Sequence, residues 1–357
     1  MVIADTIRHV RNLGGVLTKD LLRYRRALRV SEPAYLGICN RDERLEAARD
    51  GQGYRCLWQW TSDLHAPKYL PALGLSLMRR ALADHPFVFA ALPQEPTDSP
   101  DVSFIIGHRS VERLPQLLTT IGQVAGQRNA TVECIVVEQD AKVRIAGRLP
   151  SWVRHLHTPP PATDMPYCRS WAFNVGVGQA RGAVVVLHDN DMVVPADYAT
   201  NIMKHVRQGH EVVNLKRFIF CLSKKHSRAV VANKAKLTDK APVSVMQNAE
   251  GGGSIAITRT AYEQIGGFDE SFVGWGGEDN EFWERAQTLR VWPYAYLPIV
   301  HLWHAPQAGK NKRDNPTLNR YQTMAGIPAP VRIAELRKQR AGDLAGPAGW
   351  TPSSGVR

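Results

Sequence analysis

The feature that most constrains the fold is an alternation of apolar strand-like runs and helical runs that begins near residue 101. VSFIIG (102–107) and ATVECIVVEQD (130–140) predict strands, VERLPQLLTTIGQVA predicts a helix, and RSWAFNVGVGQA predicts a helix that leads into the apolar run VVVL (184–187). This spacing predicts an α/β fold with a doubly wound, mainly parallel sheet and right-handed crossovers.

Polar side chains follow three of the predicted strands. They are His108 and Arg109 after the first, Glu138 and Asp140 after the second, and Asp189, Asn190 and Asp191 after the third. Ligands of doubly wound sheets bind at the carboxyl ends of the strands. We therefore expect these side chains to meet around a charged ligand.

The Asp189-Asn190-Asp191 turn places two carboxylates at the tip of a core strand, where they repel each other and lose part of their hydration. Oxygen ligands with two negative charges suit a hard divalent cation such as Mg²⁺ or Mn²⁺, which would also bridge phosphate oxygens of a substrate. Asp and Asn are equally favoured in ordinary turns, so the turn alone leaves both interpretations open.

A second group of functional candidates lies in GGFDESFVGWGGEDNEFWERAQ (266–287). Here Gly276 and Gly277 precede Glu278 and Asp279 at the start of a predicted helix. Acidic residues in a first helical turn also occur for purely electrostatic reasons. Trp275 favours the functional interpretation, because an indole can stack on a sugar ring while a nearby carboxylate reaches one of its hydroxyls.

Two histidines, His301 and His304, follow the strand-like run YAYLPIV. A lone histidine is more often structural than a metal ligand, and the spacing of this pair changes that expectation only slightly. Their significance depends on combination with the aspartates.

Taken in order, these blocks resemble the nucleotide-sugar glycosyltransferases of the GT-A fold, specifically family 2 and the galactosyltransferase-like family 7. The resemblance covers residues 102–305 and rests on VSFIIGHRSVERL, IVVEQD, YCRSWAFNVG, VVVLHDNDMVVP, GGGSIAI with IGGFDESF, GWGGEDNEFWER and HLWH. It implies a GT-A domain over residues 101–327, with a Rossmann-like nucleotide-binding half and an acceptor half. A mostly helical extension (1–95) would precede this domain, and a C-terminal helix with a flexible tail (328–357) would follow it.

The resemblance implies a metal site for Mn²⁺ (or Mg²⁺). Asp191 would be the principal carboxylate ligand, with Asp189 near the ribose or the metal. His304 matches the family 7 histidine that completes the site. His301 stands where that family often has methionine, which leaves open whether both histidines bind.

The resemblance also implies a donor pocket for a UDP-sugar. Family 7 has a second arginine in the turn after the first strand, roughly where Val111 stands here. The implied donor-binding residues are His108, Arg109, Glu138, Asp140, Arg169, Asn174, Asp189 and Asn190.

The family's catalytic base matches Asp279, with Glu278 beside it, while Trp275, Gly276 and Gly277 would form the acceptor wall. The implied reaction is the inverting transfer of a hexose or N-acetylhexosamine from a UDP-sugar to a hydroxyl of a glycan or lipid-linked acceptor in surface polysaccharide synthesis. A catalytically inactive nucleotide-sugar or glycan-binding relative is the alternative.

Nucleic-acid binding is suggested only by the net charge of +12. The sequence contains no recognised nucleic-acid-binding motif, so we expect no nucleic-acid partner.

Residues 1–30 combine leucines and isoleucines with basic residues in a helical pattern. Such a helix suits either an anionic membrane surface or packing on its own protein with a solvated basic face. No run approaches the roughly 18 to 20 apolar residues of a membrane-spanning helix. The five cysteines are dispersed and suggest neither a zinc cluster nor a disulfide framework. We therefore expect a cytoplasmic enzyme, with peripheral membrane contact through residues 1–30 as one option.

Overall fold

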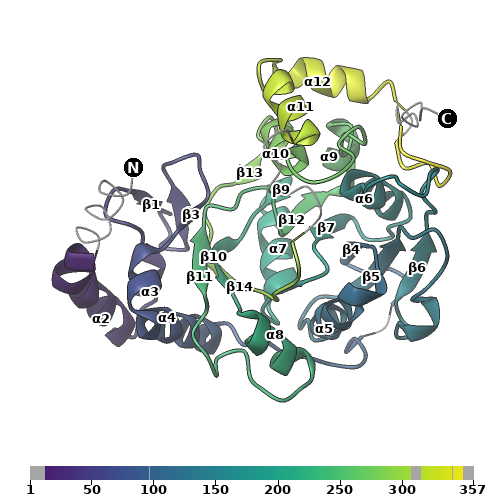
Figure 1. The fold of residues 1–357 in the computed structure, drawn as a ribbon. Coiled ribbons are helices and arrows are strands. Elements are labelled where there is room, and N and C mark those ends of the chain that lie inside the picture. The colour runs from purple at the N-terminus through teal and green to yellow at the C-terminus, as the bar shows by residue number, and fades with distance from the viewer. Residues whose placement is uncertain (1–12, 96, 307–314, 340, 349–357) are drawn as a thin grey trace.

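A computed structural model describes residues 13–95, 97–306, 315–339 and 341–348. Its centre is a seven-stranded sheet in the order β13-β9-β12-β7-β4-β5-β6 (Figure 1). These strands are β4 (Val102–His108), β5 (Val132–Glu138), β6 (Arg154–His157), β7 (Val184–His188), β9 (Val212–Val213), β12 (Ser254–Thr258) and β13 (Val291–Trp292). The four strands β7, β4, β5 and β6 pair in parallel, whereas β12 runs antiparallel to both neighbours. The predicted α/β fold with a mainly parallel sheet is confirmed.

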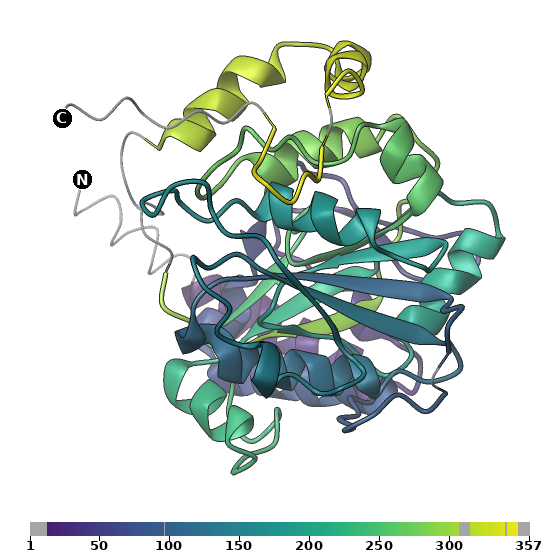
Figure 2. The ribbon, with the colours of Figure 1, turned by 90° about the vertical axis from the view of Figure 1, so that its right-hand side faces the viewer.

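Helices cover both faces of this sheet, as Figure 2 shows. They are α5 (Leu114–Ala125) and α7 (Tyr198–Arg207) on one face, and α6 (Arg169–Gly178), α9 (Arg259–Gln264) and α10 (Glu278–Ala286) on the other. Side chains of a strand point alternately to opposite faces. Phe104 and Ile106 accordingly join the core with Leu117 of α5, whereas Ile105 joins a second core with Trp171 of α6. Both cores are apolar, which is why the strands are continuous hydrophobic runs in the sequence.

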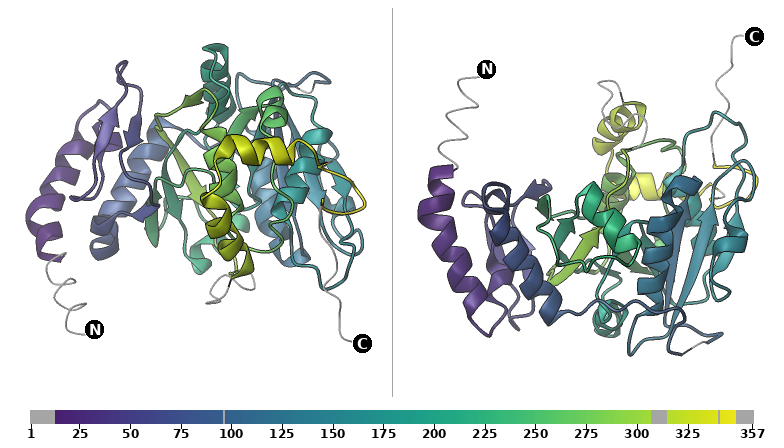
Figure 3. Two further views of the ribbon diagram at one scale, coloured as in Figure 1. Left: turned by 90° about the horizontal axis from the view of Figure 1, so that it is seen from above. Right: turned by 60° about the horizontal axis from the view of Figure 1, so that its bottom comes forward.

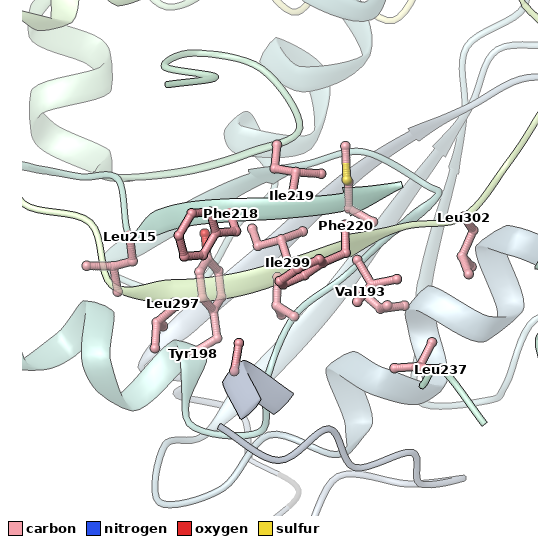
Figure 4. Close-up of a cluster of buried hydrophobic side chains, with 14 of the residues drawn as sticks. Val193, Tyr198, Leu215, Phe218, Ile219, Phe220, Leu237, Leu297, Ile299 and Leu302 are labelled. Atoms are coloured by element: carbon pink, nitrogen blue, oxygen red, sulfur yellow. The ribbon is translucent and has the colours of Figure 1, made fainter. Parts of the chain in front are cut away.

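A second sheet has the order β3-β11-β10-β14-β8. Its strands are β3 (Ser62–Asp63), β8 (Met192–Val193), β10 (Lys216–Cys221), β11 (Ser244–Gln247) and β14 (Leu297–His301). Figure 4 shows the apolar cluster that β10 and β14 build with Val193 of β8 and Tyr198 of α7. β14 runs antiparallel to β8 and places His301 opposite Met192, one residue after Asp191. This pairing brings two distant parts of the chain to one edge.

The N-terminal part packs against the second sheet, on the side away from β6 (Figure 3). It contains α2 (Leu21–Arg29), α3 (His65–Tyr69) and α4 (Pro71–Asp84), so the predicted helical character is confirmed. The prediction missed a hairpin, β1 (Leu45–Ala47) with β2 (Tyr54–Cys56), and the short strand β3. These strands escaped prediction because they are two or three residues long and partly exposed, so they carry no alternating pattern.

The basic helical pattern predicted for residues 1–30 is described from residue 13 onward, and residues 1–12 lie outside the described residues. Val16 and Tyr24 are buried in the main core, and Arg23 donates to the Cys39 carbonyl at 2.9 Å. This is the arrangement expected of a helix that packs on its own protein, and membrane contact stays a prediction. Nowhere in the described residues does a helix combine the length and apolar character needed to cross a bilayer.

After β14 the chain forms α11 (Pro316–Ala325) and α12 (Ala329–Leu336), which lie over α9 and α10 at the top of Figure 1. Arg332 of α12 is buried and pairs with Glu281 of α10 at 3.0 Å. The helix predicted in the C-terminal segment is therefore part of the packed structure. Residues 349–357 of the predicted flexible tail lie outside the described residues.

Arg217 anchors the N-terminal part to the second sheet. Its side chain is buried, and it donates to the backbone carbonyls of Leu36 at 2.8 Å and Ile38 at 2.6 Å. A third bond reaches Gln247 Oε1 at 3.2 Å. Truncation at this position would leave two buried carbonyls without donors.

We expect Arg217→Ala to lower the free energy of unfolding by about 2 to 6 kcal/mol, because each of the two unsatisfied buried carbonyls costs about 1 to 3 kcal/mol. Urea denaturation measures the change. Arg25→Ala is the control, because Arg25 is exposed and its loss should cost no more than about 0.5 kcal/mol. Equal stability of the two variants would contradict the anchoring role.

Candidate active site

The turn after β7 places Asp191 beside both predicted histidines. The Leu302 N–H donates to the Asp191 carbonyl at 2.8 Å, which ties the end of β14 to the turn. His304 Nε2 lies 3.2 Å from Asp191 Oδ2, and His301 Nε2 lies 3.7 Å from Oδ1. One ligand atom from each of the three residues lies within 4.8 Å of the others. The predicted convergence of a carboxylate and two imidazoles is therefore present in the geometry.

The electrostatics of this group suit a cation. Burial by itself raises the pKa of Asp191, but His301, Arg113 and His304 more than offset it and hold that pKa below its ordinary value. Burial lowers the pKa of His304, although the neighbouring Asp191 charge opposes the shift. Its Nδ1–H donates to the Ala305 carbonyl at 2.7 Å, leaving the Nε2 lone pair on the side of Asp191. A neutral imidazole whose other nitrogen is hydrogen-bonded is the usual form of a metal-binding histidine.

The donor set favours one type of metal over another. One carboxylate and two imidazoles fit Mn²⁺ and similar transition ions better than Mg²⁺, which prefers oxygen ligands alone. The residues present therefore fit a manganese ion held by Asp191, His301 and His304.

Asp189 has a different partner from Asp191. Its carboxylate accepts a bond from Arg169 Nε at 2.7 Å, and it is not one of the three grouped ligands. Burial raises the pKa of Asp189, although the Arg169 charge opposes the shift. The two aspartates of the turn thus have different partners, one on the histidine side and one on the α6 side.

Arg169, the first residue of α6, joins the turn to the start of α10. Besides Asp189, its guanidinium contacts the Asp279 carboxylate and lies 3.7 Å from Glu278. Its apolar face covers the Phe173 ring at 4.5 Å. A single cation, whose side chain is 11% exposed, therefore lies among three carboxylates that come from two distant segments.

The start of α10 exposes one carboxylate and buries the other. Gly276 and Gly277 have φ values of 100° and 90°, so they provide the left-handed turn that precedes the helix. The Asp279 side chain is 29% exposed, whereas that of Glu278 is 10% exposed. A Cβ at Gly252 would lie 3.2 Å from Asp279 Oδ2, so the glycine run 251–253 allows the backbone to approach this carboxylate closely. Asp279 is the carboxylate that a substrate can reach.

A cavity of about 1300 Å³ connects these groups. Nine of the predicted site residues line it, and together they bring the metal group and the candidate base to one space. They are Arg169, Asp189, Asn190, Asp191, Trp275, Glu278, Asp279, His301 and His304. Arg109 instead lines a neighbouring cavity of about 670 Å³ that it shares with Asn190 and His304.

Besides Arg109, four predicted donor-binding residues do not line the main cavity, and their contacts lie within the protein. Glu138 is fully buried and accepts bonds from the Arg144 N–H and from His155 Nε2, both at 2.8 Å. Asn174 is buried and donates to the Phe268 carbonyl at 2.9 Å and to Glu270 Oε1 at 2.7 Å. The polar groups of both residues are engaged inside the protein, so their donor binding stays a prediction that these contacts do not support.

His108 and Asp140 support the turn after β4. His108 is fully buried; burial lowers its pKa to about 4, and its Nδ1 accepts a bond from the Asn190 amide at 2.9 Å. Asp140 accepts from the Ser110 N–H at 2.8 Å, where the backbone has a φ of 81°. These contacts favour a positioning role over direct contact with the donor. His108 positions Asn190, and Asp140 positions the turn that contains Arg109. Gly276 and Gly277 likewise shape the backbone beside Trp275 without lining the cavity.

Among the cavity residues that sequence reasoning missed are Arg113, Tyr167 and Glu250. Arg113 donates to Asp191 Oδ2 at 3.0 Å. It stands two positions after Val111, the residue that occupies roughly the place of the second arginine of family 7. Tyr167 lines both cavities. Glu250 borders the main cavity, and its carbonyl accepts from Lys216 Nζ at 3.1 Å. Burial lowers the pKa of Lys216 to about 7. The sequence did contain a signal for the contact between Lys216 and Glu250. Lys216 and Arg217 stand inside the apolar strand NLKRFIF, and charged groups that are buried in a strand require polar partners.

Comparison with known proteins adds one match in sequence. Residues 239–295 match the family model described as the N-terminal domain of galactosyltransferase. The matched stretch includes the glycine run 251–253 and Asp279 but ends before His301. None of the curated proteins matches the sequence significantly.

Three of the solved structures similar to this chain are glycosyltransferases that are 13 to 16% identical to it. The catalytic domain of Drosophila β1,4-galactosyltransferase 7 in complex with xylobiose is 13% identical, with 62% of this chain and 79% of that chain covered and a TM-score of 0.35. A mutant of the same enzyme with manganese, UDP-Gal and xylobiose is 15% identical, with coverages of 60% and 66% and a TM-score of 0.33. A mannosyltransferase of Pyrobaculum calidifontis in complex with GDP-Man and Mn²⁺ is 16% identical, with coverages of 75% and 81% and a TM-score of 0.39.

We expect the two aspartates of the turn to differ in metal binding. Asp191→Asn and His304→Ala should each weaken Mn²⁺ affinity at least about tenfold, because each removes a ligand from a three-residue set. Asp189→Asn should change it less, because that carboxylate pairs with Arg169. Calorimetric titration with MnCl₂ measures all three. A larger loss in Asp189→Asn than in Asp191→Asn would reverse the assignment.

A second prediction concerns pH. Burial and the neighbouring Asp279 raise the pKa of Glu278 from 4.5 to about 7, against the opposing charge of Arg169. Between those values the folded state holds a proton that the unfolded chain has released, so this carboxyl makes the fold less stable as pH rises from 4.5 to 7. Glu278→Gln lacks this titration. The melting temperature of the variant minus that of the wild type should therefore increase from pH 5 to pH 8, and a constant difference would argue against the raised pKa.

Proposed function

We propose that this protein is a metal-dependent, inverting glycosyltransferase of the GT-A type that uses a UDP-sugar donor. The observation that carries the proposal is the convergence of Asp191, His301 and His304 at a cavity that also exposes Asp279. The family-model match over residues 239–295 supports the galactosyltransferase-like branch. Family 2, the other branch of the resemblance, has no such support.

The donor side of the cavity carries the groups that a nucleoside diphosphate needs. A bound Mn²⁺ would neutralise the negative charge that develops on the departing diphosphate. Arg113 lies at the same carboxylate, and a guanidinium there can form paired hydrogen bonds with phosphate oxygens. Arg109 borders the adjoining cavity and adds a second positive charge on that side.

Asp279 is the proposed general base. Asp279 would take the proton of an acceptor hydroxyl. At the same time the hydroxyl oxygen would form a bond to the anomeric carbon of the donor sugar, and the bond between that carbon and the diphosphate would break. The electron pair leaves with the UDP, and attack from the opposite face inverts the configuration. Arg169 contacts the Asp279 carboxylate and fixes its orientation.

The acceptor is proposed to be a hydroxyl of a glycan or lipid-linked sugar in surface polysaccharide synthesis. The transferred sugar would be a hexose or N-acetylhexosamine, and the enzyme would act in the cytoplasm, with peripheral membrane contact through residues 1–30 as part of the same proposal. The competing function, a binding protein without catalysis, is disfavoured because Asp191, Asp279 and both histidines occur together at one cavity.

Release of UDP from a panel of UDP-sugars in the presence of Mn²⁺ tests the function. We expect slow hydrolysis of at least one UDP-hexose or UDP-N-acetylhexosamine and its loss on chelation. Wild-type protein that binds Mn²⁺ and UDP but turns over no donor would favour the binding-protein alternative.

Asp279→Asn should lower transfer by about 10² to 10⁴, the usual contribution of general-base assistance. UDP affinity in the presence of Mn²⁺ should stay within a few-fold of the wild type, because the metal ligands are untouched. Rates from UDP release and affinities from calorimetry make the comparison. Substantial activity in Asp279→Asn, together with its loss in Glu278→Gln, would transfer the role to Glu278.

A further inference from the structure

The N-terminal part of the chain reaches the candidate active site. Its segment between β2 and β3, residues 57–61, lines the same cavity of about 1300 Å³ as Asp191 and Asp279. That volume exceeds the roughly 300 to 1,000 Å³ of ordinary small-molecule pockets. The cavity therefore has room for more than the donor, and the proposed mechanism uses none of the 57–61 segment.

This segment has a fixed conformation. Asn248, in a left-handed conformation with a φ of 58°, donates to the carbonyls of Trp58 at 2.6 Å and Trp60 at 3.3 Å. Thr61 Oγ1 returns a bond to the Asn248 carbonyl at 3.1 Å. Immediately after it, β3 pairs with β11. The backbone of the segment is thus held to the second sheet rather than only to the N-terminal part.

The side chains of this segment present aromatic and apolar surface to the cavity. Trp60 is 59% exposed and Leu57 is 55% exposed, although both line a concave site. Trp58 is buried, and its indole N–H has no hydrogen-bond partner among the described residues. The large exposed indole of Trp60 suits a ligand with apolar ring faces.

Other parts of the lining supply the polar side of such a site. Asn280, Glu284 and Gln287 of α10 line the cavity together with Tyr321 of α11. Amide and carboxylate groups form hydrogen bonds with hydroxyls, while aromatic rings cover the C–H faces of a sugar. The wall and the α10 side together have the chemistry that recognises a carbohydrate chain.

We infer that the 57–61 segment is an acceptor subsite in which Trp60 stacks on a sugar ring beyond the one that accepts the transferred residue. The acceptor is therefore an oligosaccharide, and it binds more tightly than the monosaccharide at its end. This inference rests on the proposed function, because it takes the ligand of the cavity to be a glycan. It gives the N-terminal part of the chain a direct role in substrate binding.

An array of monosaccharides and of oligosaccharides of increasing length, probed in the presence of Mn²⁺ and UDP, tests the subsite. Wild-type protein should bind at least one oligosaccharide at least about tenfold more tightly than its terminal monosaccharide. Trp60→Ala should lose about tenfold of that affinity, equivalent to about 1.4 kcal/mol, and Trp60→Phe should recover most of it. Phe89→Ala is the matched control, since its ring is 46% exposed and lines a different cavity, and its binding should be unchanged.

Three outcomes would each overturn the inference: equal affinity of wild type and Trp60→Ala, equal affinity for monosaccharide and oligosaccharide, or no glycan binding at all. Thermal unfolding checks that the variants are folded. UDP release by the wild type separates the two proposals. Turnover of a UDP-sugar with no effect of Trp60→Ala on glycan binding refutes only the subsite. Trp60-dependent glycan binding without any donor turnover refutes only the enzymatic function.

Discussion

Four carboxylates, those of Asp189, Asp191, Glu278 and Asp279, meet at one end of the central sheet. The rest of the site depends on the positively charged groups that lie among them. Like charges a few ångströms apart in a partly buried site repel by several kcal/mol, so they need fixed counter-charges. Arg169 supplies one for Asp189, Glu278 and Asp279. Asp191 is left to Arg113 and the two histidines. The division separates a base side from a metal side within one cavity.

The second sheet makes this division possible. Parallel strands bring the turn after β7 to the ligand-binding edge, but the histidines come from more than a hundred residues later in the chain. They arrive because β14 pairs with β10 on one side and with β8 on the other. The same sheet accepts β3 at its far edge, so the N-terminal part becomes a wall of the cavity. One sheet thus positions the metal group and the aromatic wall together.

Local patterns predicted much of this architecture. The strands and helices predicted between residues 102 and 188 are present, although β6 was not predicted, and nine of the predicted site residues line one cavity. Predictions of side-chain contact were less successful. Glu138 and Asn174 are residue types that often bind ligands. In the structure, however, Glu138 forms a hydrogen bond with His155, and Asn174 forms one with Glu270. Those partners lie 17 and 96 positions away, so no local pattern identifies them.

The sequence by itself determined the alternating elements, the polar strand ends and the acidic start of α10, because hydrophobic periodicity and turn chemistry act over a few neighbouring residues. Only the tertiary structure decided that Arg113 joins Asp191 and the histidines, and that Trp60 lies at the same cavity. These outcomes depend on strand pairing and on the balance of buried charges. Both are set by groups far apart in the chain, which become neighbours only when the sheets assemble.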